Sequence, residues 1–464
     1  MTIDILPDEG LLEIFSFYLV EASDHIEPWF PLVHVCRRWR SIVFASPHRL
    51  DVRVFYTPAR RVKAMLDIWP NLPIHISAHG YKASRWYGEK ENLIAALEHT
   101  DRICQIQFHA FSSSELERIL SAMQKPFPAL TRLAISGSPS MPMTVFPQAF
   151  LGGSARHLQS CNLWDVGFPG IRKLLLTANH LVTLRLWHIP HSMCASPGEM
   201  ATCVSMMPNL EALFIGFHLP QSPHKWPDHP NRLLSPLARV VLPSLTKFGL
   251  QVMSEYIEDF VSRIDVPLLD KVYMNVFDPP IFDDPRLHDF LTRIEKFKTH
   301  SRGVVVFYNA CIELELKPEL GFLSFGIHCG ELGQQVSSMA HFCGSSLPLP
   351  ATLKRLDICE GFVSQNLDRQ ERVENTQWLD IFHPFTGLKD LYLGERLVFH
   401  YADALQELAG ERVKEVLPAL QRLFIEGLER LEPSGPTQEA LGKFVAARQL
   451  SGLPVVVHSW DGRS

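Results

Sequence analysis

The stretch FPALTRLAI (residues 127–135) sets a pattern that recurs through most of this chain. Its apolar positions follow the phrase L-x-x-L-x-L, and the alternation at its end predicts a short strand with the leucines on one face. Clear copies are NHLVTLRLW (179–187), MPNLEALFI (207–215), LPSLTKFGL (242–250), PATLKRLDI (350–358), FTGLKDLYL (385–393) and LPALQRLFI (417–425). Weaker copies are DRICQIQF (101–108), ARHLQSCNL (155–163) and PLLDKVYM (267–274). The repetition predicts one structural unit that is used many times.

The leucine that opens each phrase marks the length of the repeat. Leu130, Leu158, Leu181, Leu210 and Leu245 lie 28, 23, 29 and 35 residues apart. This is the leucine-rich-repeat signature at the upper, irregular end of its period. One strand with its return segment cannot bury its apolar face alone, so neighbouring units stack into a solenoid. We therefore expect an α/β fold, with a small helical region at the N-terminus followed by an irregular leucine-rich-repeat-like solenoid.

Segments between the phrases predict the return helices and the ends of the array. SSELERILSAMQ (113–124) and RLHDFLTRIEKF (286–297) have helical periodicity. Between residues 275 and 350 the phrase blurs, but GVVVFY, CIELEL and GFLSFGI still indicate short strands, so we expect the array to continue with longer excursions. Residues 57–79 predict a helix from Pro58 and a first strand, and residues 436–460 predict a closing helix and a last strand.

The composition is typical of a folded protein with an acidic balance. The chain has 464 residues, 46% of them hydrophobic, and a formal net charge of −6. Phosphate binding rests mainly on basic charge, so no nucleic-acid partner is expected. No apolar run of about 18 residues predicts a membrane span, and the N-terminus lacks the features of a secretory signal. Nine scattered cysteines without a C-x-x-C pair indicate reduced thiols, and thus the cytoplasm or nucleus.

Two apolar segments precede the array. LPDEGLLEIFSFYL (6–19) predicts a helix that starts at Pro7 and is apolar around most of its circumference. WFPLVHVCRRWRSIVF (29–44) predicts a second helix, with one face formed by Leu32, Val35, Cys36, Trp39 and Ile42 and with its arginines off that face. A unit of about 50 residues is marginally stable alone. We therefore expect a partner to cover part of its apolar surface.

Together these two segments resemble the F-box. The resemblance rests on Leu6-Pro7-x-Glu9-x-x-Leu12 at the start and on VCRRWRSI (35–42) in the second segment. F-box proteins bind the Skp adaptor of cullin–RING ubiquitin ligases and present target proteins to them. The resemblance implies an adaptor surface, and a small core behind it, formed by Leu6, Pro7, Leu12, Ile14, Phe15, Val35, Trp39 and Ile42. The connector VEASDHIEPWFP (20–31) is longer than usual for the family and resembles that of the expanded F-box sets of mushroom-forming fungi.

The resemblance implies that residues 1–52 are the F-box and that residues 53–464 are a substrate-binding solenoid. The chain would then be the substrate-recruiting subunit of an SCF (Skp–cullin–F-box) ubiquitin ligase. Its partners would be a Skp-type adaptor, a cullin–RING ligase reached through that adaptor, and an unidentified target protein. Two alternatives stay open: an F-box protein that works with the adaptor outside a ligase, and a repeat scaffold in which residues 5–50 only cap the array.

The repeat phrase also predicts which side chains could hold a target. Leucines of the phrase face the core, whereas the positions between them face the concave side of the sheet. Aromatic and arginine side chains are enriched at binding hot spots. Candidate target-binding residues are Asn162, Trp164, Arg185, Trp187, Phe214, Tyr273, Tyr392 and Phe424, with the Trp164/Trp187 pair favoured. The competing interpretation is that loops cover several of them as ordinary core.

No sequence motif indicates catalysis or a cofactor. The chain contains no G-x-S-x-G, H-E-x-x-H, P-loop or G-x-G-x-x-G pattern, so we expect no enzyme activity. The loop 216–236 carries His218, His224 and His229 among prolines, but it reads as a surface loop, and no metal site is expected. DPPIFDDP (278–285) and ARRVK (59–63) likewise read as solvated segments.

Overall fold

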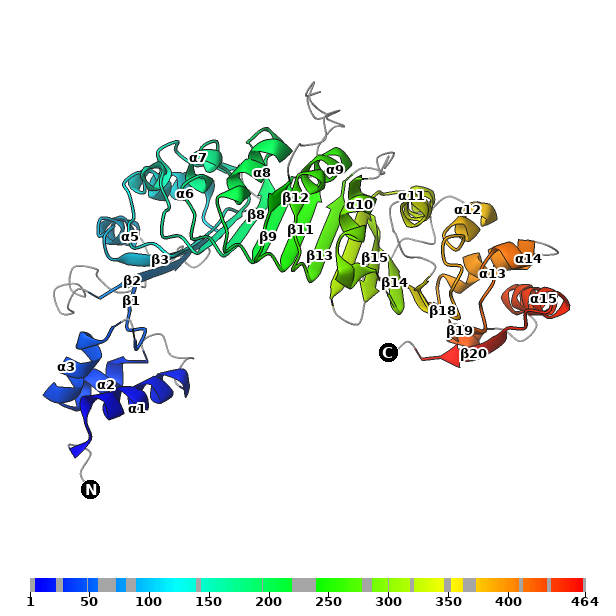
Figure 1. The fold of residues 1–464 in the computed structure, drawn as a ribbon, viewed down its shortest axis with the longest axis horizontal. Helices are drawn as coiled ribbons and strands as arrows, with labels where there is room; N and C mark the ends of the chain where they lie inside the picture. The colour runs from blue at the N-terminus through cyan, green and yellow to red at the C-terminus, as the bar shows by residue number, and fades with distance from the viewer. Residues whose placement is uncertain are drawn as a thin grey trace. The chain divides into compact units, whose positions relative to one another are not determined.

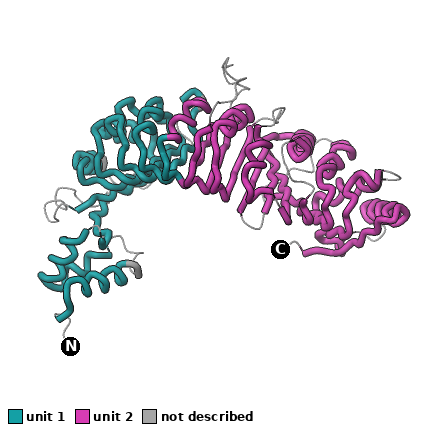
Figure 2. Tube along the Cα trace, viewed as in Figure 1, with its two compact units in different colours: residues 1–195, 206–210 teal, residues 196–205, 211–464 magenta. Residues whose placement is uncertain are grey.

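The computed structural model describes residues 5–21, 28–47, 49–56, 72–80, 89–138, 143–193, 195–218, 239–277, 286–298, 300–317, 321–345, 352–361, 373–408, 412–431 and 435–461. Strands and helices alternate along this part of the chain (Figure 1). Figure 2 shows its division into two compact units. Unit 1 comprises Met1–Ala195 and Met206–Leu210, and unit 2 comprises Ser196–Ser205 and Glu211–Ser464.

Unit 1 begins with three helices that share one apolar core. They are α1 (Asp8–Glu21), α2 (Phe30–Val35) and α3 (Arg37–Ala45). Helix α1 begins one residue after the predicted start, with the Pro7 carbonyl accepting from the Leu11 N–H at 3.1 Å. The core continues into strand β1 (Val54–Tyr56), because Trp29 packs in the same cluster as Val54 and donates its indole N–H to the Arg53 carbonyl at 2.8 Å.

The predicted single helix over residues 29–44 is wrong, because the helix is interrupted at Cys36. Cys36 has extended backbone (φ −158°, ψ 171°), and its sulfur accepts from the Trp39 N–H, which caps the start of α3. The side chain of Arg40 donates to the Val33 carbonyl at 2.9 Å and so satisfies an open carbonyl at the end of α2. Helical spacing continues through the break, and cysteine is not among the preferred N-cap residues, so neither periodicity nor capping preference predicts it.

The rest of unit 1 is a parallel sheet with helices on one face. Its strands follow the order β1, β2 (Ile74–His79), β3 (Ile103–His109), β4 (Arg132–Ser136), β6 (Ser160–Trp164) and β8 (Thr183–Ile189). The helices are α5 (Glu89–Leu97), α6 (Ser113–Ala122) and α7 (Ile171–Leu175), and a short pair joins β5 (Thr144–Val145) to β7 (Val166–Gly167). The predicted strands and the predicted helix at 113–124 are confirmed.

The first leucine of each phrase lies in a turn that starts the strand. Leu130 is buried there, and the following residue joins a ladder between repeats: the Thr131 N–H donates to the Cys104 carbonyl, and the Thr131 carbonyl accepts from the Gln159 N–H at 2.8 Å. The phrase therefore places one leucine beneath the turn and the next two on the buried face of the strand.

Unit 2 repeats the same construction over ten strands. Their order is β9 (Ala212–Phe217), β11 (Lys247–Val252), β13 (Lys271–Val276), β16 (Phe322–His328), β15 (Cys311–Lys317), β14 (Arg302–Phe307), β17 (Arg355–Glu360), β18 (Asp390–Leu393), β19 (Arg422–Glu426) and β20 (Val456–Trp460). A separate short pair joins β10 (Val240–Val241) to β12 (Ile264–Asp265). The helices are α8 (Pro197–Ser205), α9 (Ser254–Ser262), α10 (Arg286–Thr292), α11 (Leu332–Ser345), α12 (Asn375–Asp380), α13 (Val398–Gln406), α14 (Arg412–Glu415) and α15 (Pro436–Leu450).

Where the phrase blurs, the array does not simply continue with longer excursions. All three predicted strands form, but β15 is antiparallel to both β14 and β16, and the order in the sheet is reversed relative to the chain. Strand β16 pairs with β13, and β14 pairs with β17, both in parallel. A short connection over residues 308–310 joins β14 to β15, whereas a parallel pair requires a longer crossover. The meander brings Glu313 and Glu315 of β15 into the middle of the sheet.

The closing helix and last strand are confirmed as α15 and β20. A buried arginine on α15 forms hydrogen bonds that hold this cap in place. Arg448 is 1% exposed, and its guanidinium donates to the carbonyls of Val413, Leu417, Leu420 and Leu453 at 2.9 to 3.2 Å. The turn at Leu417 needs this support because its backbone is left-handed (φ 52°). Arg448 therefore joins the cap to the repeat before it.

Four sequence predictions lie outside the described residues. They concern the helix from Pro58, the segment ARRVK, the histidines at 224 and 229, and DPPIFDDP. Among the described residues, no helix has the length and hydropathy of a membrane span.

We predict that Arg448→Met destabilises the C-terminal cap by about 3 kcal/mol, since a hydrogen bond to a charged group contributes about 1.5–3 kcal/mol and several buried carbonyls lose their donor. Faster amide hydrogen exchange across residues 435–461 would measure the change. Lys443→Met on the exposed side of the same helix is the matched control, with an effect of about 0.5 kcal/mol or less. Equal exchange in the two variants would contradict this role of Arg448.

Candidate functional site

Helix α1 divides its apolar residues between two faces. Leu11, Leu12 and Phe15 are buried, whereas Ile14 is 44% exposed and Phe17 is 72% exposed. Ile14 and Phe17 are three residues apart and thus lie on one side of the helix. Further exposed apolar side chains of this module are Ile5, Leu6, Tyr18, Phe30 and Val35. We call these seven residues the N-terminal apolar surface.

A small aromatic core holds that surface in place. The rings of Phe15 and Trp39 lie 4.7 Å apart, and Trp29 is 1% exposed beside Phe44. Arg38 links the ends of the module, because its guanidinium donates to the Asp8 carboxylate at 2.7 Å and to the Leu6 carbonyl at 2.5 Å. The sequence interpretation treated the arginines only as a solvated rim. Arg38 also fixes where α1 begins relative to α3.

The eight predicted adaptor residues fall into two groups. Leu6, Pro7, Ile14 and Val35 are exposed, whereas Leu12, Phe15 and Ile42 are buried and Trp39 is half-buried. The structure thus places four of them at the surface and four in or against the core. Sequence reasoning missed the exposed residues Ile5, Phe17, Tyr18 and Phe30. Spacing from Ile14 could have found Phe17 and Tyr18, which lie three and four residues further along the helix. The role of all eight in adaptor binding stays a prediction.

In unit 1, the favoured tryptophan pair lies on the open face of the sheet, the face without helices. Trp164 and Trp187 are in register on β6 and β8, their ring centroids 5.9 Å apart, and Trp164 is 41% exposed. His188 packs edge-on against Trp164, and its Nδ1 lies 3.1 Å from the Asp165 carboxylate. Asn162 and Arg185 are the pair one step earlier on the same face, with Arg185 exposed.

In the first half of unit 2, the predicted aromatics are half-buried. Phe214 and Tyr273 flank Gly249 of β11, and their rings are 6.1 Å apart. A β-carbon on Gly249 would lie 2.3 Å from the Phe214 ring, so the glycine allows that ring to lie across the strand. Phe214 and Tyr273 therefore agree better with the interpretation that neighbouring residues cover these rings than with the interpretation that they are exposed target-binding residues.

At the C-terminal end of unit 2, Tyr392 and Phe424 belong to a larger stack. Their rings are parallel, with centroids 4.2 Å apart. The Arg355 guanidinium lies 3.8 Å from the centroid of Tyr392, and His458 stacks on Phe424 at 5.0 Å. Trp460 meets Tyr392 edge-on at 5.1 Å. The sequence analysis missed His458 and Trp460, although both alternate along the last strand and face the same way as Tyr392.

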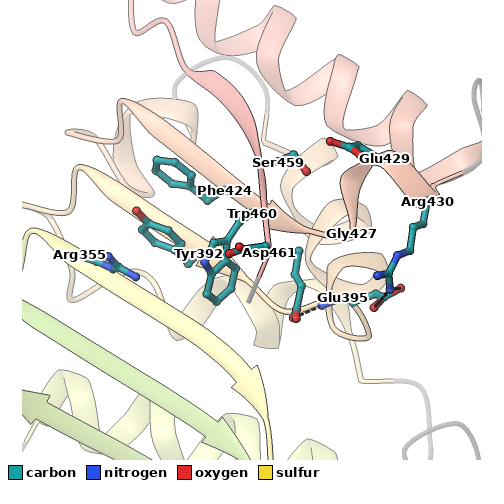
Figure 3. A pocket seen from close by; sticks show the side chains of 11 residues that line it. Arg355, Tyr392, Glu395, Phe424, Gly427, Glu429, Arg430, Ser459, Trp460 and Asp461 are labelled. Atoms are coloured by element: carbon teal, nitrogen blue, oxygen red, sulfur yellow. Dashed lines mark hydrogen bonds and ion pairs between the residues drawn. The ribbon is translucent and has the colours of Figure 1, made fainter. Parts of the chain in front are cut away.

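The rings of Tyr392, Phe424 and Trp460 line an open pocket of about 720 Å³, shown in Figure 3. Strands β18, β19 and β20 contribute Tyr392, Phe424 and Trp460, and the turn after β19, which includes the 3-10 helix η8 (Leu428–Arg430), contributes Arg430. The carboxylate of Glu426 accepts from the Glu395 N–H at 3.2 Å, and Glu395 pairs with Arg430 at 3.2 Å. The pocket therefore combines aromatic rings with carboxylates.

Charged side chains of both signs lie on the strands that precede this pocket in the sheet. Glu313 and Glu315 come from β15, and the buried Asp357 is bracketed by Arg302 and Arg355 at 2.5 and 2.7 Å. The thiol of Cys359 lies on the same face. Burial raises its pKa to about 11, and nearby carboxylates, Glu426 among them, add to the increase.

The structure shows no site that could hold a metal within its described residues. No cluster of three His, Cys, Asp or Glu side chains there has the required arrangement. His218 is described, but its two companions in the predicted loop are not, so that prediction remains untested.

The N-terminal module matches a known protein family. A model of the F-box-like family matches residues 3–53. No curated protein matches the chain. Among solved structures, the chain is similar to the leucine-rich repeat-containing protein LegL7 from Legionella pneumophila, with 13% identity, coverage of 84% of this chain and 96% of that chain, and a TM-score of 0.28. The chain thus has an F-box-like N-terminal region followed by an α/β repeat array, with the repeat evident in its own strands.

We predict that Glu426→Gln lowers the pKa of the Cys359 thiol, because one of the carboxylates that raise it is removed. The thiolate is the reactive form, so a lower pKa means a larger reactive fraction at about pH 9. Iodoacetamide labelling of the peptide that contains Cys359, followed by mass spectrometry, should proceed severalfold faster than in the wild type. Glu117→Gln on helix α6 of unit 1 is the control. Unchanged labelling in Glu426→Gln would show that Glu426 does not act on this thiol.

Proposed function

We propose that this chain is the target-recruiting F-box subunit of an SCF ubiquitin ligase. In this proposal helices α1 to α3 bind a Skp-type adaptor, and the open face of the repeat array holds a target protein. Through the adaptor the chain joins a cullin–RING ligase in the cytoplasm or nucleus. The sequence of its long connector, residues 20–31, supports assigning it to the fungal-type members of the F-box family.

The N-terminal apolar surface is the observation that carries this proposal. The F-box-like family model covers the residues that form it, and this match supports a Skp-type adaptor as the occupant of the surface. Several large exposed apolar side chains on one small folded module indicate a protein partner. Phe17 at 72% and Ile5 at 74% exposure present area that an adaptor would bury. The core residues behind them keep their positions without the partner.

The chain would act by positioning rather than by bond chemistry. Binding adaptor and target at once turns ubiquitin transfer into a reaction within one complex, at raised effective concentration. A sheet face is suited to this because its side chains project in a fixed register from a rigid backbone. The ligase partners would supply the catalytic groups.

One observation also favours the scaffold alternative. The core of the three helices includes Val54 of the first strand and Leu72, so the helices already pack on the start of the array. A capping role would account for Leu11, Leu12 and Phe15. It would not account for Ile14 and Phe17, which face away from that core.

We predict that the wild-type chain co-elutes with a Skp-type adaptor at 1:1 in size-exclusion chromatography after co-expression. Ile14→Glu combined with Phe17→Glu should weaken binding by about a hundredfold or more, since two charges would be buried without partners. Both sites are exposed, so the variant keeps its core. Leu12→Asp or Trp39→Ala would disturb the core itself and could not separate the two effects.

Leu450→Glu is the matched control, because Leu450 is 90% exposed and lies at the end of α15, not in helices α1 to α3. It should bind the adaptor like the wild type. If folded wild-type chain forms no complex, or if the double variant binds as well as the control, the adaptor assignment is overturned and the scaffold alternative takes its place.

A further inference from the structure

The pocket at the C-terminal end of unit 2 has a composition that selects for positive charge. Its lining carries two arginines against four carboxylates, Glu395, Glu426, Glu429 and Asp461, a net charge of −2. We propose that this pocket takes the side chain of an arginine or lysine from a basic segment of the target. The proposal rests on the function proposed above and specifies the chemistry of the target.

The carboxylate of Glu426 is placed to receive such a cation. Among the described residues it pairs with no basic side chain, and its hydrogen bond comes from a backbone N–H at 3.2 Å. One backbone donor leaves most of the acceptor capacity of a carboxylate unused. Glu426 lies on β19 in register with Trp460, so an incoming cation would meet a carboxylate and an indole side by side.

The chain already binds guanidinium groups in this setting. Arg355 lies over the Tyr392 ring at 3.8 Å, which is close contact for a cation–π pair. Arg430, whose side chain is 76% exposed, crosses the rim to pair with Glu395 at 3.2 Å. These two contacts show that the rings and carboxylates here accept arginine, and Arg430 is free enough of packing to move aside.

An anionic ligand fits this pocket poorly. Arg355 donates to Asp357 through Nε at 2.7 Å and through Nη2 at 3.1 Å, so its guanidinium is already engaged with a carboxylate, which it shares with Arg302. Arg430 is likewise engaged with Glu395. An incoming carboxylate would have to displace one of these partners and would face Glu426 and Glu429, whereas a cation gains Glu426 without breaking a pair.

Trp460 offers a direct readout of binding in the full-length chain. We would incorporate 5-fluorotryptophan and assign its fluorine resonance by its absence in Trp460→Phe. The probe is the blocked peptide Gly-Gly-Arg-Gly-Gly, with the citrulline peptide as a neutral probe of the same shape and the glutamate peptide as an acidic one. The arginine peptide should shift the Trp460 resonance with a saturable, millimolar dependence, and the citrulline peptide should bind about tenfold more weakly.

The matched variants separate the pocket from general charge. Glu426→Gln should weaken binding of the arginine peptide about tenfold, whereas Glu117→Gln in unit 1 removes the same charge and should leave binding unchanged. The remaining tryptophan resonances would show that each variant is folded. The proposal is overturned if the arginine peptide gives no shift at about 10 mM, if citrulline binds as well, or if the glutamate peptide binds better.

The test is independent of the adaptor. A chain that binds the adaptor but not the arginine peptide would overturn the pocket assignment and leave the proposed function intact. A chain that binds the peptide but no adaptor would retain the cation pocket and overturn the ligase role.

Discussion

Burial of the leucine phrase between sheet and helices is the constraint on which this structure depends. The strands of the main sheet are only three to seven residues long, too short for one of them to bury its apolar side chains alone. Leu133, Leu163 and Leu423 are each 1% exposed or less because neighbouring strands cover their flanks and a helix covers their ends. Because the leucines face the helices, the residues between them face the open side of the sheet. The set of side chains on the open face is therefore a consequence of the packing pattern.

That constraint explains why the candidate sites are groups of side chains from different repeats. Tyr392, Phe424 and His458 are far apart in sequence, but parallel register aligns them across three strands. In a parallel ladder, residues at equivalent positions of neighbouring strands lie side by side, so aromatic residues at those positions can stack. Arg448 maintains this register at the end of the array, because it holds the last helix against the carbonyls that precede β19. The cap and the pocket are thus mechanically connected.

Sequence periodicity predicted the elements better than it predicted their connections. The strands at each clear phrase follow from alternation, and the closing helix follows from its apolar spacing. The reversal of β15 could not be predicted, because its alternation suits a parallel or an antiparallel neighbour equally. The break at Cys36 was not predicted, because the apolar residues keep their helical spacing on both sides of this single extended residue.

The candidate sites were predicted in part for the same reason. Alternation places Trp164 and Tyr392 on the open face, and both lie there. Alternation does not predict how much of a ring is covered by its neighbours. Phe214, which lies over Gly249, is therefore less exposed than Trp164, although both residues lie on the open face. The favoured tryptophan pair has His188 beside it, whereas the Tyr392 stack gains Arg355 from β17 and His458 and Trp460 from β20. Partners of that kind become visible only when register is known.

Hydrogen exchange of the full chain with and without a Skp-type adaptor tests the central claim most directly, namely that the N-terminal module and the open face serve different partners. The account predicts slower exchange confined to residues 8–21 and 30–45, with the strands of both units unchanged. Protection spread over the strands β17 to β20, or no protection in the N-terminal helices, would contradict it.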